Sequence, residues 1–243
     1  MDRFAVISDV HGNRWALEAV LEDIAAAGVA DVVDLGDTLY GPLDPRGTAE
    51  LLMARGFPTV RGNEDHEITD DVAEVSATLA FTRDQLAPAH LDWLRALPAR
   101  LVLDDILLCH GTPDSDTTYL LWTVARSGAR LRTPAESAAL IPRTDCTLIL
   151  CGHDHVPGRL DLPDGRLVVD PGSVGLPAYD DDAPHPHVMQ AGTPHARYAI
   201  VSRDGAGWRA EHRAVAYDWE AAAVAAAAHG RPDWARWLLM GQA

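Results

Sequence analysis

Short apolar runs in this chain end repeatedly in small polar clusters that contain glycine, and this pattern constrains the fold more than any other feature. Five runs are followed in this way by an aspartate, an asparagine or a histidine. The clusters are Asp9-Val10-His11-Gly12-Asn13, Gly36-Asp37, Gly62-Asn63, His110-Gly111 and Gly152-His153-Asp154-His155. Glycines at strand ends permit tight turns that bring the backbone close to a ligand. The pattern therefore predicts a sheet with its functional side chains at the ends of the strands.

The segments between these clusters alternate between strands and helices. Apolar residues at three- and four-residue steps predict a helix from Trp15 to Ile24, with Asn13 as its cap and Gly28 as its stop. Further helices are expected over 46–55 and 72–97. Strands are expected over 4–8, 31–35, 59–60, 100–103, 106–109, 147–150, 159–162, 166–169, 197–202 and 208–213. Short apolar strands separated by helices indicate a buried sheet with parallel strands.

Two stretches show no regular pattern. Residues 111–141 are irregular, and residues 180–194, which mix an acidic triplet with prolines, are expected to form a loop. The chain closes with an alanine-rich helix and a short amphipathic helix, in which Trp219, Trp234 and Trp237 are expected to pack. We expect residues 1–243 to form a single domain, with residues 216–243 as a C-terminal helical extension.

Composition and charge argue against several classes of protein. The 243 residues carry a net charge of −16, and all 20 basic residues are arginines, so binding to a nucleic-acid duplex is not expected. No apolar stretch reaches the roughly 18 residues that span a bilayer. The N-terminus resembles a core strand rather than a signal peptide, which predicts a cytoplasmic protein without membrane contact. The three cysteines are expected to be buried thiols.

The polar clusters are expected to meet in space, because ligands of such sheets bind outside the carboxyl ends of the strands. The side chains that would meet are two aspartates, an asparagine and four histidines: Asp9, His11, Asp37, Asn63, His110, His153 and His155. Carboxylate, amide and imidazole groups suit borderline divalent metals such as manganese, iron, zinc or nickel. The sequence therefore predicts a metal centre at the strand ends.

These residues resemble the motifs of the calcineurin-like metallophosphoesterase superfamily, and the likeness extends over most of the chain. The patterns D-x-H-G, G-D, G-N-x-D, H-G and G-H-x-H occur in that order as Asp9–Gly12, Gly36-Asp37, Gly62–Asp65, His110-Gly111 and Gly152–His155. Tyr40-Gly41-Pro42 and Pro171-Gly172-Ser173-Val174-Gly175 are similar to the bacterial phosphodiesterase-like branch. One such motif is not specific, whereas five in order are.

The resemblance implies an α/β fold, a four-layer α/β/β/α sandwich of two mixed sheets flanked by helices, with two divalent metal ions between the strand ends. By motif position, Asp9, His11 and His155 would hold one ion, Asn63, His110 and His153 the other, and Asp37 would bridge both. A water shared by two such ions loses a proton near neutral pH, and the resulting hydroxide attacks phosphorus in line. Manganese is the expected metal.

The chain departs from the family pattern next to Asn63. Many relatives have a histidine at the following position, where it assists the leaving group, but this chain has Glu64, followed by Asp65 and His66. Glu64 is a candidate proton donor if burial raises its pKa, and His66 is an alternative from nearby. A second interpretation is that no strong general acid exists. We take Glu64, Asp65 and His66 as the candidate catalytic residues.

Other polar residues near the motifs have simpler expected roles. Asp154, in the middle of the G-H-x-H motif, is expected to accept a hydrogen bond from a ligand histidine. His185, His187 and His195 are expected to lie in a solvated loop rather than to bind an additional metal.

The expected function is a two-metal phosphodiesterase acting on nucleotide-derived or other small phosphodiesters, since the absence of the usual histidine at Glu64 favours diesters over monoesters. The alternatives within enzymes are a phosphoprotein phosphatase and a dinucleoside polyphosphate hydrolase. The alternative outside enzymes is a non-catalytic metal-binding interaction scaffold, because a fold does not by itself imply a function. The partner is expected to be a small phosphoester, and a homo-oligomer is left open.

Overall fold

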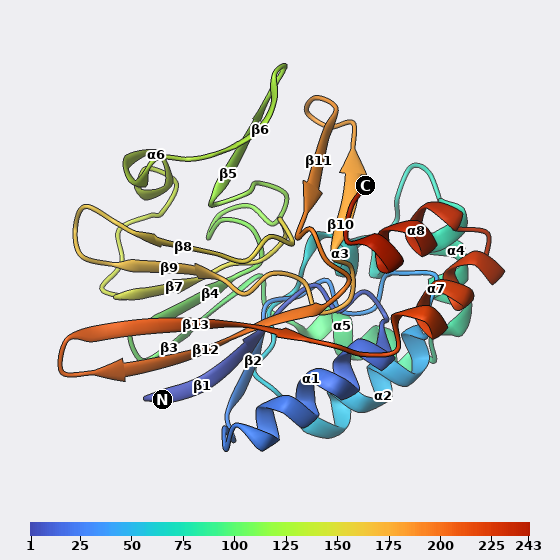
Figure 1. Cartoon of the computed structure of the whole chain (residues 1–243), viewed down its shortest axis with the longest axis horizontal. Helices are drawn as coiled ribbons and strands as arrows, with labels where there is room; N and C mark the ends of the chain where they lie inside the picture. Colours follow the sequence, from blue (N-terminus) through green and yellow to red (C-terminus); the bar gives the residue numbers. More distant parts are fainter.

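Two mixed β-sheets stacked face to face form the centre of the protein (Figure 1). The structure is a computed structural model, and it describes residues 1–243. The strand order of the first sheet is β13-β12-β1-β2. Its strands are β1 (Arg3–Ile7), β2 (Val32–Asp34), β12 (Ala196–Asp204) and β13 (Gly207–Val215). Strand β1 is parallel to β2 and antiparallel to β12, so the sheet is mixed.

The second sheet has the strand order β3-β4-β7-β9-β8. Its strands are β3 (Arg100–Leu103), β4 (Ile106–Cys109), β7 (Leu148–Leu150), β8 (Gly158–Asp161) and β9 (Leu167–Asp170). The three central strands run parallel, and the two edge strands are antiparallel to their neighbours. The carboxyl ends of β4 and β7 therefore lie at one edge of this sheet, beside the carboxyl ends of β1 and β2 from the first.

Alternation along β1 explains why the sheets pack in layers. Phe4 and Val6 point between the two sheets, where they pack with Ile106 and Leu108 of β4 in one buried cluster. The intervening side chains point to the opposite face and pack against helix α1 (Arg14–Ala26). The α1 helix begins as predicted, because the Asn13 side chain accepts a hydrogen bond from the Ala16 amide at 3.1 Å.

The outer face of the second sheet is covered by the segment 119–146, which contains the short helix α6 (Pro134–Ala138). Leu107 and Ile149 of the sheet pack there against Leu120 and Ile141. The order of layers is thus helix, sheet, sheet and helix, which confirms the predicted α/β/β/α sandwich. The three cysteines are buried free thiols, as predicted.

The remaining six helices lie beside α1 or at the edge where the strands end. They are α2 (Pro45–Arg55), α3 (Asn63–Thr69), α4 (Ala77–Gln85), α5 (Pro88–Ala96), α7 (Trp219–Ala228) and α8 (Pro232–Met240). Trp234 and Trp237 of α8 are buried in the same hydrophobic cluster as Leu39 and Leu176. The C-terminal helices therefore pack directly against the segments that follow β2 and β9.

The helix predicted over 72–97 is two helices, α4 and α5. Pro88 occupies the first turn of α5. A proline disfavours helical geometry at the residue that precedes it, so the chain is extended at Leu86 and Ala87. The Ser76 side chain caps α4 by accepting from the Leu79 amide, which sets the start of that helix later than predicted.

Two β-hairpins occupy the stretches that lacked a clear pattern. One consists of β5 (Trp122–Ala125) and β6 (Gly128–Leu131), and the other of β10 (Ala178–Asp181) and β11 (His187–Gln190). The prediction of a loop over 180–194 was therefore wrong. Both hairpins rise on the same side of the two main sheets in Figure 1, above the strand ends.

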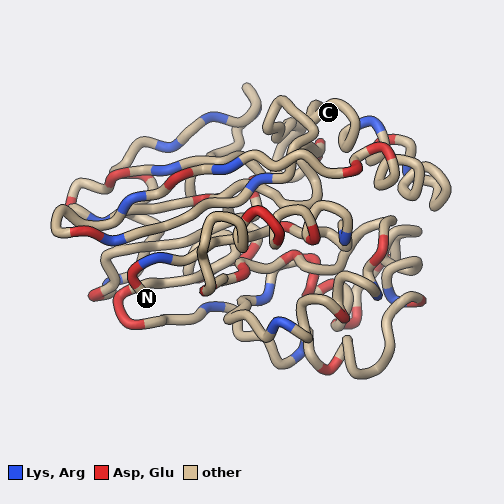
Figure 2. Tube along the Cα trace, turned by 60° about the horizontal axis from the view of Figure 1, so that its bottom comes forward, with Lys and Arg blue, Asp and Glu red and all other residues tan.

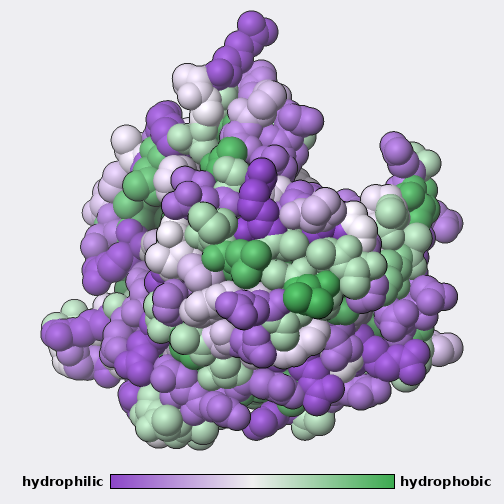
Figure 3. Space-filling model, turned by 45° about the vertical axis from the view of Figure 1, so that its right-hand side comes forward, coloured by the Kyte–Doolittle hydropathy of each residue, from purple (hydrophilic) through white to green (hydrophobic).

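The surface agrees with the acidic composition. Acidic residues lie all along the trace with arginines scattered among them (Figure 2). On the face that carries the C-terminal helices, apolar residues lie in small groups among hydrophilic ones (Figure 3), and α7 and α8 expose Val224, Leu239 and Met240. None of the helices combines the length and apolar character needed to cross a lipid bilayer.

Candidate metal centre

Each predicted ligand follows the end of a strand, and all of them meet between the two sheets. Asp9 and His11 follow β1, Asp37 follows β2, His110 follows β4, and His153 and His155 follow β7. Asn63 opens helix α3, just after Thr59 forms a parallel bridge with Asp34 of β2. A cavity of ≈ 210 Å³ opens above this group and is lined by His11, Asp37, Asn63, His153 and His155 among others.

Five of these seven residues have a left-handed backbone conformation that non-glycine residues rarely adopt. The φ angles are 54° at Asp9, 50° at His11, 52° at Asp37, 73° at His153 and 62° at His155. Such conformations cost about 1–3 kcal/mol each and cluster at functional sites. Hydrogen bonds between the loops hold them: the Asp9 amide donates to the Gly36 carbonyl at 2.9 Å, and the His11 amide donates to the Asp37 carbonyl at 3.0 Å.

Asp9, His11 and His155 form the first group of potential ligands. The Nε2 atoms of His11 and His155 lie 3.0 Å apart, and His155 Nε2 lies 3.4 Å from Asp9 Oδ1. The Nδ1 atoms of the two histidines face the Tyr40 carbonyl at 3.1 Å and the Leu176 carbonyl at 2.7 Å. Because a carbonyl can only accept, each Nδ1 carries the hydrogen, and the two Nε2 atoms turn their lone pairs toward each other.

Asp9 supplies an independent sign that a cation belongs in this group. Its Oδ1 atom is buried and has no hydrogen-bond donor, although its Oδ2 atom accepts from the His153 amide at 3.1 Å. A buried carboxylate oxygen without a partner is costly. The two imidazole lone pairs and the unpartnered oxygen therefore fit a divalent cation better than they fit one another.

Asp37, His110, His153 and Asn63 form the second group. His110 Nε2 lies 3.1 Å from both Asp37 Oδ2 and Asn63 Oδ1, while its Nδ1 donates to the Leu35 carbonyl at 2.8 Å. The same argument applies to the neutral form of His110, because its Nε2 atom then turns a lone pair toward two acceptor oxygens. The backbone carbonyls fix each histidine tautomer and ring orientation, which is how the surroundings of a metal site usually orient imidazole ligands.

The field inside the centre favours positive charge. Burial opposes protonation of His11, but the Glu64 carboxylate at 3.0 Å and the aspartates raise its pKa to about 9. Burial likewise opposes protonation of His110, yet Asp37 and Asp9 raise its pKa to about 10. In contrast, burial and the neighbouring His110 lower the pKa of His153 to about 4. The buried carboxylates thus stabilise a cation at this point, whether it is a proton or a metal ion.

The three candidate catalytic residues occupy different places. Only Glu64 lines the cavity, and burial raises its pKa to about 7. His66 does not line it and forms an ion pair with Asp116 at 2.5 Å. Asp65 is fully buried and faces the loop after β2, where its carboxylate accepts hydrogen bonds from Asp37, Thr38 and Gly62. The geometry does not aim Asp65 or His66 at a substrate.

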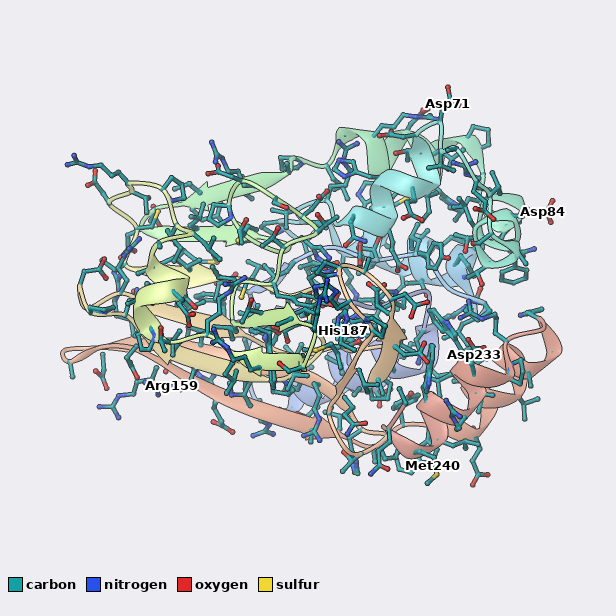
Figure 4. The ribbon with its side chains drawn as sticks, turned by 90° about the horizontal axis from the view of Figure 1, so that it is seen from above. Asp71, Asp84, Arg159, His187, Asp233 and Met240 are labelled. Carbon is teal, nitrogen blue, oxygen red and sulfur yellow. The ribbon has the colours of Figure 1, made fainter.

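Two other expectations were wrong. Asp154 does not accept from a ligand histidine; its Oδ1 accepts from the Val156 amide at 2.9 Å. It lies beside the Asp170 carboxyl, and burial raises the pKa of both groups, to about 8 for Asp154. His187 is buried rather than solvated, and Figure 4 places it near the middle of the molecule, whereas the labelled Asp71 and Asp84 lie at its periphery.

A hydroxyl chain connects His187 to the centre, and the sequence held no signal of it. The Tyr179 hydroxyl donates to the His153 carbonyl at 3.1 Å, and the Tyr119 hydroxyl oxygen lies 2.5 Å from that of Tyr179. His187 Nε2 lies 3.0 Å from the Tyr119 oxygen. The rings of Tyr119 and Tyr179 also pack against His153 and His155 with centroids 4.8 and 4.6 Å apart. Hairpin β10–β11 therefore braces the histidines that follow β7.

The C-terminal helix α8 contributes another wall that sequence reasoning assigned only to packing. Arg231, Trp234 and Trp237 line the cavity beside His11, and the rings of Trp234 and His11 meet edge to face at 5.8 Å. The Trp237 indole nitrogen is buried without a hydrogen-bond acceptor.

Comparison with known proteins agrees with this geometry. The sequence profile of the calcineurin-like phosphoesterase superfamily domain matches residues 3–191. The crystal structure of a metallophosphoesterase from Sphaerobacter thermophilus is 28% identical, covers 99% of both chains and superposes with a TM-score of 0.78. The structure of a hypothetical protein from Pyrococcus horikoshii OT3 shares the fold, with 21% identity, 99% coverage of both chains and a TM-score of 0.77.

An uncharacterized protein from Methanocaldococcus jannaschii is 28% identical over 199 residues, which cover 71% of this chain and 76% of that protein. The profile match takes in every strand-end cluster described above, from Asp9 to His155. The protein therefore belongs to the calcineurin-like phosphoesterase superfamily.

Proposed function

We propose that this protein hydrolyses small phosphodiesters, including nucleotide-derived ones, with the help of two divalent metal ions. The observation that carries the proposal is the convergence of the Nε2 atoms of His11, His110 and His155 on buried carboxylate oxygens, at a point where those carboxylates stabilise a cation. Such a set repels itself unless a cation lies within it. This property favours a working metal centre over a scaffold that has kept only the fold.

We assign the ligands in two sets that share one carboxylate. Asp9, His11 and His155 would hold one ion, Asn63, His110 and His153 the other, and Asp37 would contact both. In support, the ligand atoms of Asp9, His11 and His155, and those of Asp37, His110 and His153, lie within 4.8 Å of one another in each group. The mixture of imidazole, carboxylate and amide donors is compatible with manganese, which we propose as the metal. Bound divalent ions supply Lewis acidity toward phosphoryl oxygens and lower the pKa of water.

The chain's own residues would complete the reaction. Among the three candidate catalytic side chains, Glu64 is the one that lines the cavity, so we propose that it donates a proton to the departing oxygen. Asp65 would position the loop that carries Asp37, and His66 would remain paired with Asp116. A carboxylic acid is a modest proton donor, which favours diesters with good leaving groups.

The test compares bis-p-nitrophenyl phosphate with p-nitrophenyl phosphate, first after chelation and then after addition of Mn²⁺. We expect chelation to abolish cleavage and Mn²⁺ to restore it, with the diester cleaved well above the monoester. Asp37→Asn should lower the restored rate about 100-fold or more, because the two metal ions would lose the anionic ligand that they share. The transition state would then lose several kcal/mol of stabilisation. The exposed Asp92→Asn on α5 serves as the matched control.

Each contrary result has a clear meaning. A preference for the monoester would replace the phosphodiesterase by a phosphatase. Bound metal with no cleavage of either ester would favour the interaction scaffold. Near-normal turnover by Asp37→Asn would contradict the proposed ligand set.

A further inference from the structure

A second cavity lies on the other side of the candidate metal centre. It has a volume of ≈ 430 Å³ and sits between the β5–β6 and β10–β11 hairpins, with Trp122, Val124, Arg132, Ala183 and Pro184 in its walls. We call it the hairpin cavity. Four residues line both this cavity and the one beside α8: Asn63, Tyr119, His153 and Asp181. Two members of the second group of candidate ligands, Asn63 and His153, therefore lie where the two cavities adjoin.

Arg132 distinguishes the hairpin cavity from the rest of the surface. Its only side-chain hydrogen bond runs from Nε to the Tyr119 carbonyl at 3.4 Å, and no carboxylate lies within ion-pair distance of its guanidinium. Arg231, which lines the other cavity, is by contrast held by Asp233 at 2.6 Å and by Thr78. Of the two arginines beside the centre, one is occupied by the protein and the other keeps both Nη groups free.

The free guanidinium is also partly withdrawn from water. Burial lowers the pKa of Arg132 although Glu136, which is paired with Arg130, acts against this shift, so the fold bears a desolvation cost for this cation without a directly paired carboxylate. One carboxylate, that of Asp181, also lines the cavity. It is exposed, does not pair with Arg132, and accepts from the Ala183 amide at 2.8 Å within its own turn. In a chain with a net charge of −16, an unpaired arginine beside a phosphoester centre is best explained by an anionic ligand.

The remaining walls suit an organic group that carries such an anion. Trp122 is half-buried at the base of hairpin β5–β6, and the hydroxyl groups of Thr117 and Thr118 lie along the same cavity. Hairpins β5–β6 and β10–β11 contact each other, so the cavity is walled on both sides rather than being an open slope. An aromatic face, hydroxyl groups and an arginine are the groups that proteins use to hold a phosphorylated nucleoside or a similar arm.

We propose that the hairpin cavity receives one ester arm of the diester substrate and that Arg132 binds a second phosphate carried by that arm. This inference rests on the proposed function, because it requires a phosphodiester at the centre. The planar guanidinium can donate two parallel hydrogen bonds to phosphate oxygens, which a single point charge cannot. Arg132 is thus a specificity-determining residue of the proposed reaction.

The test uses two diesters with the same leaving group. They are thymidine 5′-(p-nitrophenyl phosphate) and the same compound with an additional 3′-phosphate, both assayed with Mn²⁺ at constant ionic strength. For the unmodified protein we expect a KM about tenfold lower for the compound with the additional phosphate. Arg132→Gln should abolish that difference. Arg132→Lys should retain only part of it, because lysine lacks the bidentate fork.

Arg130→Gln is the matched control, because Arg130 lies on the same hairpin but is exposed and paired with Glu136 at 2.7 Å. Thermal unfolding of each variant shows whether it is folded. If the unmodified protein cleaves both diesters with equal KM, or if Arg130→Gln and Arg132→Gln act alike, the inference is overturned while the proposed function stands. If no diester is cleaved with Mn²⁺ present, the proposed function itself fails.

Discussion

Asp65 provides the sharpest test of whether a residue in the G-N-x-D segment positions the metal centre or acts on the substrate. Its Oδ2 atom accepts from the amides of Asp37 at 2.9 Å and Gly62 at 3.1 Å. Its Oδ1 atom accepts from the Thr38 amide at 3.0 Å and the Thr38 hydroxyl at 2.8 Å. Four donors from two loops therefore converge on one carboxylate that has no exposed surface.

Asp65→Asn keeps the shape but removes one acceptor. If the amide nitrogen faces Thr38, the hydroxyl can accept from it, but the Thr38 amide loses its partner. The opposite orientation leaves the Asp37 and Gly62 amides unpaired, so the first orientation is preferred. One unpaired buried N–H together with the weaker bonds of a neutral acceptor costs about 3 kcal/mol.

Burial and the nearby Asp37 raise the pKa of Asp65, so its charged form is costly to bury. Asp65→Asn removes that desolvation cost together with the charge, and the loss of about 3 kcal/mol in unfolding free energy is therefore an upper figure. For a chain of this length, a loss of about 3 kcal/mol lowers Tm by roughly 6–12 °C. The assay is thermal unfolding in excess chelator, with Asp70→Asn, an exposed carboxylate at the end of the same helix, as the control.

The same change should weaken metal binding, because the Asp37 amide loses its anchor. We expect a loss of about 10–100-fold in Mn²⁺ affinity, as for other residues that orient ligands, measured as the Mn²⁺ concentration that gives half-maximal activity. At saturating Mn²⁺, kcat should recover to within a few-fold of the unmodified protein. An unchanged Tm and Mn²⁺ affinity combined with a lost kcat would refute the positioning role and return Asp65 to the substrate.

Three further outcomes are expected. Removal of metal by chelation should lower Tm, because a ligand at about 1,000 times its Kd stabilises by about 4 kcal/mol; an unchanged melting curve would contradict a bound metal. Burial raises the pKa of Asp34 well above its usual value. As the pH rises above about 4, this carboxyl ionises in the unfolded chain but not in the folded protein, so the free energy of unfolding falls by up to about 1.4 kcal/mol per pH unit. Asp34→Asn should flatten that fall in urea titrations with chelator, and parallel curves would refute it. Glu64→Gln should slow esters with poor leaving groups about 100-fold while sparing p-nitrophenyl esters; equal losses would exclude proton donation.

The convergence of the seven candidate ligands could be predicted because sheet geometry largely determines where residues that follow a strand are placed. Residues that directly follow parallel strands are placed at one edge whatever the rest of the chain does. His110 and His155, for example, follow neighbouring strands of the second sheet and are 45 positions apart only because a hairpin and a helix intervene. Residue type and position relative to a strand end were sufficient.

Position in the sequence was a poorer guide to the roles of the three candidate catalytic residues. Glu64, Asp65 and His66 are consecutive, but they lie in the first turns of helix α3, where each residue points about 100° away from the one before. Glu64 therefore faces the cavity, Asp65 faces the loop beneath, and His66 turns toward Asp116. Without knowing where the helix begins, the three directions could not be separated.

The hairpin β10–β11 escaped prediction for a different reason. Along β11, His187 and Met189 are buried while Val188 is exposed, so the pattern of polarity along the strand is partly inverted. The inversion exists because the buried His187 contacts Tyr119 in the hydroxyl chain that reaches His153. Strand β10 gives a weak signal as well, because it begins with Ala178 and ends in acidic residues with low strand propensity. Local propensity fails here because the strand is built for the site rather than for the core.

In the proposed function, substrate choice would depend on these less predictable parts. In the proposed reaction the strand-end ligands would hold the metal ions and would not touch the organic arms of the substrate. The walls of the two cavities come from α8, which lies beyond the matched residues 3–191, and from two hairpins without recognisable patterns. Arg132 and Arg231 look alike in the sequence, and only the presence of Asp233 beside one and no carboxylate beside the other separates a structural arginine from one that is free to bind. Specificity in this protein must therefore be sought in which charges the fold leaves unpaired near the centre.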